Sequence, residues 1–224
     1  LRMALEAVEE GLWDWDIPTG KCYYSPRFYT MLGFEPGGFP ATYEGWISCV
    51  DPSDLDMFQN NIDEYLSEGK GHYSIEFRAR KKSGEVCWLE SRGRAVAWDS
   101  KGVPVRMVGT HMDITRRKEI ENAVSLERQK LLSILGAMND GVFITNRDHG
   151  VEFINSALIE EFGLPEGKRC YELFGGRSSP CSWCGNDEVF AGKTIRWEWY
   201  SEAKDRFYDM FATPIRNSDG TITK

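Results

Sequence analysis

The sequence predicts an α+β protein made of two tandem domains joined by a long helix, on the basis of a repeat and a strand order. Shifting the chain by 130 positions aligns residues 11–16 with residues 141–146. The same shift aligns residues 25–34 with residues 155–164. Such a long register indicates duplicated domains, because solenoid repeats are much shorter. The predicted boundaries are 1–115 for the first domain, 116–138 for the linker helix and 139–224 for the second domain.

The composition is that of a soluble globular protein with room for two domains of about 100 residues each. The net charge of -8 argues against nucleic-acid binding, which needs a concentrated basic surface. No stretch approaches the ~20 apolar residues of a membrane span. The six cysteines show no evenly spaced disulfide framework, which favours the reducing cytoplasm.

The first domain begins with two strands, continues with helices and ends with three strands. Gly20 lies in the turn of a hairpin, and Pro26 suits the first turn of a helix. Asp51 is the expected N-cap of a longer helix, with Pro52 at its first position and Asp54 completing a capping box. The expected elements are strands 12–16 and 21–24, helices from Pro26, at 43–49 and at 51–67, and strands from Tyr73, at 86–98 and at 103–114.

The second domain follows the same plan but stops before its last strand. Its turn at Asn217–Gly220 matches the turn at Asp99–Gly102 of the first domain. The expected elements are strands 142–146 and 151–155, a helix at 156–162, and strands at 195–199 and 206–216. We expect the missing strand to leave the sheet of this copy split and edge-exposed, so that either a few strands remain in a marginal domain or a neighbouring chain fills the gap. The natural protein is expected to continue.

The linker contains no glycine or proline until Gly136, and its apolar residues follow an a/d heptad pattern interrupted by Glu127. Two interpretations stay open: a spacer helix that packs on its own domain, or a parallel coiled coil that makes a homodimer. The apolar positions are Ile120, Val124, Leu131, Ile134 and Met138.

The order of elements, the Asp51-Pro52-Ser53-Asp54 helix start and the Asp113-Ile114-Thr115 exit motif before a charged helix resemble the PAS domain family. The resemblance covers residues 4 to about 123 and again about 131 to the end. It implies a five-stranded antiparallel sheet in the order 2-1-5-4-3, helices on one face, and a pocket between the two layers. Tandem PAS domains of this kind belong to bacterial or archaeal signalling proteins, most often sensor histidine kinases.

Two groups of candidate residues follow in the first domain. Asp113, Ile114 and Thr115 are the expected signal-transmission residues, with Asp113 capping the linker helix. The candidate ligand pocket contains Trp13, Trp15, Phe28, Phe58, Phe77 and His111, of which His111 faces either the pocket or solvent. A flavin stays a candidate cofactor although the reactive cysteine of flavin photosensors is absent, and haem is disfavoured.

Cys170, Cys181 and Cys184 form a cysteine-rich loop that the first domain lacks. A Cys-x-x-Cys pair suits zinc, an iron–sulfur cluster or a dithiol–disulfide couple. Covalent haem is excluded because Gly185 occupies the position where that motif needs histidine. Plain loop thiols are the remaining alternative.

No Ser/His/Asp set, phosphate loop or cyclase motif is present, so we expect a non-catalytic sensory module. Its predicted partners are a second copy of the chain, an output domain such as a histidine kinase, and a small ligand. Three functions compete: a small-molecule or cofactor sensor, a redox or metal sensor, and a ligand-free dimerisation and relay module.

Overall fold

The computed structural model describes residues 10–68, 71–202 and 204–223. The chain divides into two compact units, Leu1–Val124 and Ser125–Lys224. The division falls inside helix α5 (Thr115–Ala137), so the predicted domain boundaries at residues 115 and 138 stay predictions. The helix expected to end near Val8 lies outside the described residues.

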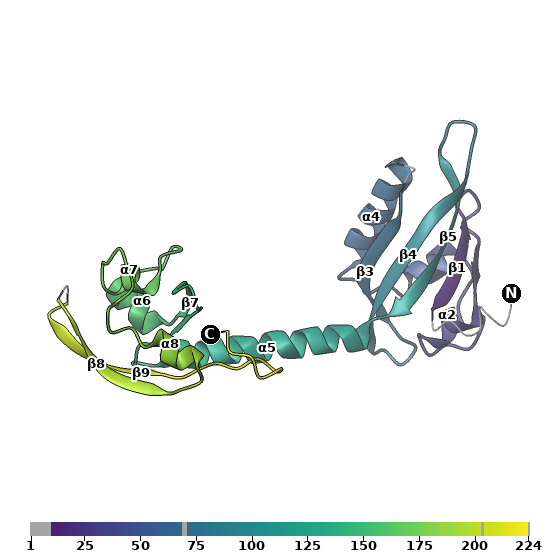
Figure 1. Cartoon of the computed structure of the whole chain (residues 1–224). Coiled ribbons are helices and arrows are strands. Elements are labelled where there is room, and N and C mark those ends of the chain that lie inside the picture. The colour runs from purple at the N-terminus through teal and green to yellow at the C-terminus, as the bar shows by residue number, and fades with distance from the viewer. Residues whose placement is uncertain (1–9, 69–70, 203, 224) are drawn as a thin grey trace. The chain divides into compact units, whose positions relative to one another are not determined.

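The first unit contains a five-stranded antiparallel sheet in the order β2-β1-β5-β4-β3 (Figure 1). Strand β5 is central because it pairs with both β1 and β4. The predicted strand order is therefore confirmed. The strands are β1 (Gly11–Asp16), β2 (Cys22–Tyr24), β3 (Tyr73–Arg80), β4 (Val86–Trp98) and β5 (Pro104–Asp113).

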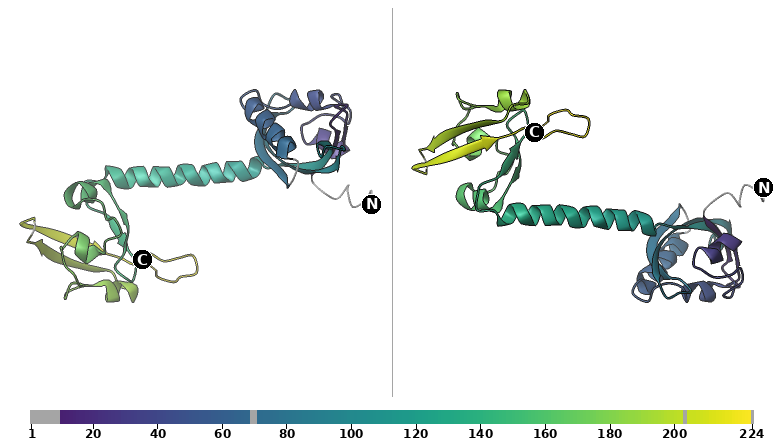
Figure 2. Two further views of the ribbon diagram at one scale, coloured as in Figure 1. Left: turned by 90° about the horizontal axis from the view of Figure 1, so that it is seen from above. Right: turned by 90° about the horizontal axis from the view of Figure 1, so that it is seen from below.

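Three helices lie over one face of this sheet: α2 (Pro26–Thr30), α3 (Tyr43–Ile47) and α4 (Leu55–Glu68) (Figures 1 and 2). Strands β1 and β3 alternate buried and more exposed positions, as expected for a sheet with one covered face. The core lies between the two layers and is rich in aromatic side chains. Phe28, Leu32 and Phe77 are at its centre, each 1 % exposed or less.

The start of α4 corrects one detail of the predicted capping. Helix α4 begins at Leu55 and not at the predicted Pro52; residues 52–54 form a turn in which the Asp51 carboxylate accepts a hydrogen bond from the Ser53 N–H at 3.0 Å. The Asp54 carboxylate does not reach back to the Asp51 N–H. It accepts bonds from the backbone N–H and the guanidinium of Arg78 on β3, at 2.7 and 3.0 Å. The capping-box prediction for Asp54 is wrong because an arginine lies within reach.

Helix α5 contains 23 residues, and none of its side chains is buried. Most of its apolar residues are exposed, with Ile120, Val124, Leu131 and Ile134 each more than half exposed. No helix within the described ranges is long and apolar enough to cross a membrane.

The second unit contains two separate two-stranded sheets, β6-β7 and β8-β9. In the five-stranded order of the first unit, the central strand would join β6 to β9, and the described residues of this unit supply no such strand. Its elements are β6 (Phe143–Thr145), β7 (Val151–Ile154), α6 (Ser156–Phe162), α7 (Cys170–Leu173), α8 (Asn186–Phe190), β8 (Ile195–Ser201) and β9 (Arg206–Ala212). The smaller, divided sheet is the one expected for a copy that ends before its last strand.

The duplication is visible in individual hydrogen bonds. In the first unit the Leu12 N–H donates to Ser25 Oγ and the Ser25 N–H donates to the Leu12 oxygen, both at 3.0 Å. In the second unit the Val142 N–H donates to Asn155 Oδ1 and the Asn155 N–H donates to the Val142 oxygen, both at 2.9 Å. Val142 and Asn155 lie 130 positions after Leu12 and Ser25, so the predicted register between the two copies holds.

Candidate functional site

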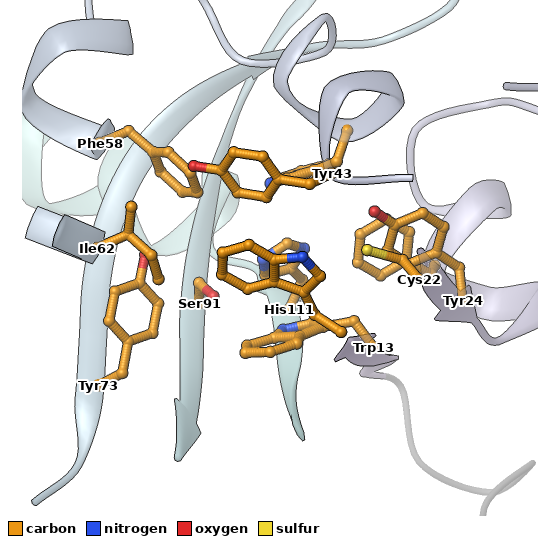
Figure 3. Close-up of a pocket in the computed structure, with 12 residues that line it drawn as sticks. Trp13, Cys22, Tyr24, Tyr43, Phe58, Ile62, Tyr73, Ser91 and His111 are labelled. Carbon is orange, nitrogen blue, oxygen red and sulfur yellow. The ribbon is translucent and has the colours of Figure 1, made fainter. Parts of the chain in front are cut away.

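The candidate site is a small cavity between the sheet and the helices of the first unit (Figure 3). Five of the six predicted pocket residues line it, and the sixth, Phe77, packs behind Phe58 with ring centroids 4.8 Å apart. The cavity volume is about 30 Å³, enough for about two water molecules. Its wall consists of Trp13, Trp15, Cys22, Tyr24, Phe28, Tyr43, Trp46, Phe58, Ile62, Tyr73, Ser91 and His111.

The cavity is too small for the candidate cofactors flavin and haem. Pockets that enclose cofactor-sized ligands have volumes of roughly 300–1,000 Å³. A flavin or haem does not fit a cavity of about 30 Å³ unless the surrounding aromatic side chains are displaced. The arrangement fits a much smaller occupant.

The indole ring of Trp13 packs directly on the backbone of two glycines, Gly93 and Gly109, which we call the glycine seat. Trp13 pairs with Gly109 on β5, and Gly109 pairs in turn with Gly93 on β4. A Cβ atom at Gly109 would lie 2.4 Å from Trp13 Cζ2, and one at Gly93 would lie 2.6 Å from Trp13 Cη2. The two glycines therefore allow the indole ring to lie close to the sheet.

His111 faces the cavity, not solvent, and is 3 % exposed. The rings of Trp46, Phe28 and Phe77 surround it at centroid distances of 4.4, 4.8 and 5.8 Å. Burial lowers the pKa of His111 to about 3, because the apolar surroundings disfavour the charged imidazolium. At neutral pH His111 is therefore an uncharged hydrogen-bonding group.

Sequence reasoning missed several residues of the cavity wall. Tyr73 was detectable, since it occupies the same inward face of β3 as Ile75 and Phe77, at every second position of the strand. Tyr43 and Trp46 come from a short helix whose inward face has no clear periodicity, and Tyr43 stacks on Trp15 at 4.5 Å.

The predicted transmission residues lie where β5 meets α5. Asp113 Oδ1 accepts hydrogen bonds from the backbone N–H and the hydroxyl of Thr115, at 2.9 and 2.5 Å. Thr115 Oγ1 accepts a bond from the Trp88 N–H at 3.0 Å, and the Ile114 N–H donates to the Trp88 oxygen at 2.9 Å. These bonds attach the first residue of α5 to strand β4.

Charged side chains reinforce this attachment. The Lys118 ammonium lies 2.5 Å from a carboxylate oxygen of Glu76 on β3, and Arg117 pairs with the other oxygen of the same carboxylate. Lys118 Nζ also lies 5.3 Å from the ring centroid of Trp88, within cation–π distance. The first turn of α5 thus contacts both β3 and β4.

The three cysteines of the second unit are free thiols of intermediate burial. Burial, and then the proximity of Cys184 and Cys181, raise the pKa of Cys170 to about 11; burial also raises the pKa of Cys181. Reactive and metal-binding cysteines are thiolates with lowered pKa values. No group of three or more His, Cys, Asp or Glu residues within the described ranges could hold a metal ion. The metal-site and redox-pair predictions for these three cysteines therefore both stay predictions.

Family comparisons agree with the architecture of both units. The family model of the PAS fold matches residues 21–111, and that of the PAS domain matches residues 139–224.

Similar proteins include the sensor protein FixL of Bradyrhizobium diazoefficiens, 26% identical over 74% of this chain and 32% of the relative. The probable diguanylate cyclase DgcE of Escherichia coli is 23% identical over 69% of this chain and 14% of the relative. The chain thus spans a third or less of these relatives.

A solved domain of a sensory box histidine kinase/response regulator from Burkholderia thailandensis is also similar. It is 36% identical, with a TM-score of 0.51, over 58% of this chain and 95% of that structure.

Proposed function

The chain belongs to the PAS domain family, with two sensor domains in tandem, and we propose that the first domain transmits the state of its cavity to helix α5. One observation carries this proposal: β5 contributes to both the cavity and the helix start. His111 lines the cavity, and Asp113, two residues later, bonds to the first residue of α5. A shift of β5 therefore acts on the helix without an intermediate element.

Strand β4 provides a second connection between the cavity and helix α5. Ser91 lines the cavity, and Trp88, three residues earlier on the same strand, bonds to Thr115 and Ile114. A ligand that favours one of two positions of these strands would change the orientation of α5.

A ligand-free relay module is the second candidate function, and the small cavity volume supports it. In that case the aromatic residues serve as a filled core, and the signal originates in another part of the protein. The two candidates differ in whether any small molecule enters the cavity.

We infer that the parent protein is a sensor histidine kinase, with the kinase outside this chain. The similar domain from Burkholderia thailandensis supports this inference, because it belongs to a histidine kinase/response regulator. The similarity to a probable diguanylate cyclase makes a cyclase the alternative output.

The transmission role of Thr115 predicts the effect of Thr115→Val. Valine keeps the shape of the side chain but removes the two bonds of the Thr115 hydroxyl, to Asp113 and to the Trp88 N–H, so the unfolding free energy should fall by only about 1–2 kcal/mol. The amide NMR shifts that a cavity substitution such as Trp46→Phe induces in residues 116–121 should at least halve in this background. Asp113→Ala should act in the same way.

Thr110→Val is the matched control, because it makes the same chemical change on β5 outside the Asp113–Thr115 connection. It should leave the shifts of residues 116–121 unchanged. Full transmission of the Trp46→Phe shifts in the Thr115→Val protein would contradict the relay.

We further infer that α5 associates with α5 of a second copy. Its exposed residues Ile120, Val124, Leu131 and Ile134 lie at a and d positions of a heptad pattern. Helices of this kind obtain most of their stability from burying an apolar stripe, and no side chain of α5 is buried within the chain.

The dimer predicts that Leu131→Asp weakens self-association at least tenfold in sedimentation equilibrium, because it places a charge in the helix–helix interface. Leu126→Asp is the matched control: Leu126 is 69 % exposed and lies off the a/d stripe, so its replacement should change the dimer little. A monomeric parent protein, or equal effects of the two substitutions, would rule out this interface.

A further inference from the structure

The cavity wall contains four buried polar atoms without a hydrogen-bond partner. They are Trp13 Nε1, Trp15 Nε1, Tyr73 Oη and His111 Nδ1, and only one other such side-chain atom, Trp197 Nε1, occurs among the described residues. The four side chains come from β1, β3 and β5, are at most 9 % exposed, and all line the same cavity (Figure 3). A buried polar group left unpaired costs about 1–3 kcal/mol, so four around one space indicate a polar occupant.

The hydrogen-bonding character of these atoms restricts the occupant. An indole N–H only donates, so Trp13 and Trp15 both require an acceptor. The Tyr73 hydroxyl also donates readily. A molecule that satisfies this set must therefore present an accepting atom, such as a carbonyl oxygen, toward the two indoles.

The charge of the cavity excludes ions as good occupants. Among the described residues, no Asp, Glu, Lys or Arg side chain lines it. His111 is the one basic group in the wall, and the rings of Trp13, Phe28, Trp46 and Phe77 surround it. An ion transferred into such surroundings without a counter-charge loses far more hydration free energy than a neutral polar molecule, whose smaller loss is offset by hydrogen bonds to the wall.

From these observations we propose that the cavity of the first domain binds a small neutral molecule of the carbonyl or amide class, whose oxygen accepts hydrogen bonds from the Trp13 and Trp15 indoles. The volume of about 30 Å³ limits the molecule to a few heavy atoms. The inference deepens the proposed function, because it names the ligand class of the same cavity.

Four probes of three heavy atoms each separate the alternatives: formamide is neutral and accepting, formate is anionic, formamidinium is cationic, and propene is apolar. Each is titrated into the full ¹⁵N-labelled chain while the indole N–H signals, assigned with Trp→Phe variants, are followed. Formamide should shift the Trp13 and Trp15 signals and bind at least fivefold more tightly than the other three. An advantage for formate, formamidinium or propene would overturn the ligand class, as would ordered water that no probe displaces.

Two variants test the assigned donors. Trp15→Phe should weaken formamide binding at least fivefold. Trp98→Phe should change it less than twofold, because it removes an indole nitrogen of the same domain at a side chain that is 48 % exposed and does not line the cavity. If Trp15→Phe fails to fold, Tyr73→Phe removes only a hydroxyl and should weaken binding at least threefold. Unchanged binding in the folded variants would overturn the assignment.

The ligand class and the relay fail in different ways. Formamide that shifts the indole signals but not the amides of residues 116–121 would support the ligand class and count against the relay. A charged probe that shifts residues 116–121 would support the relay and overturn the ligand class.

Discussion

Acidification from pH 7 to pH 4 is expected to lower the unfolding free energy of the first domain by about 3 kcal/mol through His111 alone. Burial lowers the pKa of His111 to about 3 in the folded domain, against 6.5 for the exposed group. Between these values the unfolded chain binds a proton that the folded domain does not, so the unfolded state gains stability as the pH falls. The contribution of His111 is complete above pH 6.5 and decreases toward pH 3, at up to about 1.4 kcal/mol per pH unit.

Carboxylates with lowered pKa values lose their stabilising effect at lower pH. The hydrogen bonds from Ser53 and Arg80 lower the pKa of Asp51 to about 2, and the bonds from Arg78 lower that of Asp54. These groups have ordinary pKa values near 4, so they contribute their stability above pH 4 and lose it below that value. The interval from pH 6.5 to about 4.5 therefore reports mainly on histidine.

Urea unfolding of the full chain at a series of pH values, followed by tryptophan fluorescence, measures this effect. The matched variant is His111→Phe, which keeps a ring at the same position and removes the titrating group. Its stability should depend less steeply on pH between 6.5 and 4.5 than that of the parent. Identical slopes for the two proteins would show that His111 is not held neutral by burial.

Local patterns in the sequence predicted the elements and much of the cavity. Trp13 and Trp15 alternate along β1, so they had to lie on one face of the sheet, and both line the cavity. The orientation of His111 was left open, because both faces of a central strand beneath a single layer of helices were compatible with its neighbours. The structure resolves this through rings supplied by α2 and α3.

Contacts between distant residues were beyond the reach of local patterns. Asp54 looked like a capping residue, but its partner Arg78 lies 24 positions later, on a strand brought near only by the fold. The cavity volume likewise depends on how twelve side chains pack together, and composition alone gave no measure of it.

The two domains differ at the positions that define the cavity. In the repeat register, Trp13 and Trp15 correspond to Phe143 and Thr145. The buried core of the second unit is small, with Ile154, Leu158 and Leu173 at its centre. The indole donors are therefore a property of the first domain, and the proposed ligand class applies to that domain alone.

The glycine seat beneath Trp13 predicts that Gly109→Ala lowers the unfolding free energy by about 3 kcal/mol, at the upper end of the usual cost of overpacking. The added Cβ would lie 2.1 Å from the Arg92 backbone oxygen and 2.4 Å from Trp13 Cζ2. The Arg92 oxygen belongs to β4, which pairs with β5, so it cannot move without disturbing the sheet. Urea unfolding at neutral pH measures the loss.

Gly93→Ala separates the two causes of this loss. A Cβ at Gly93 would meet the Trp13 ring at 2.6 and 2.7 Å, with the Val108 oxygen at 2.9 Å. In a Trp13→Phe background the cost of Gly93→Ala should therefore fall by at least half, because the smaller phenyl ring leaves room for the added Cβ atom. The cost of Gly109→Ala should fall much less, since the Arg92 oxygen remains in place. Equal relief at both positions would mean that the indole alone, and not the paired strands, requires glycine at this site.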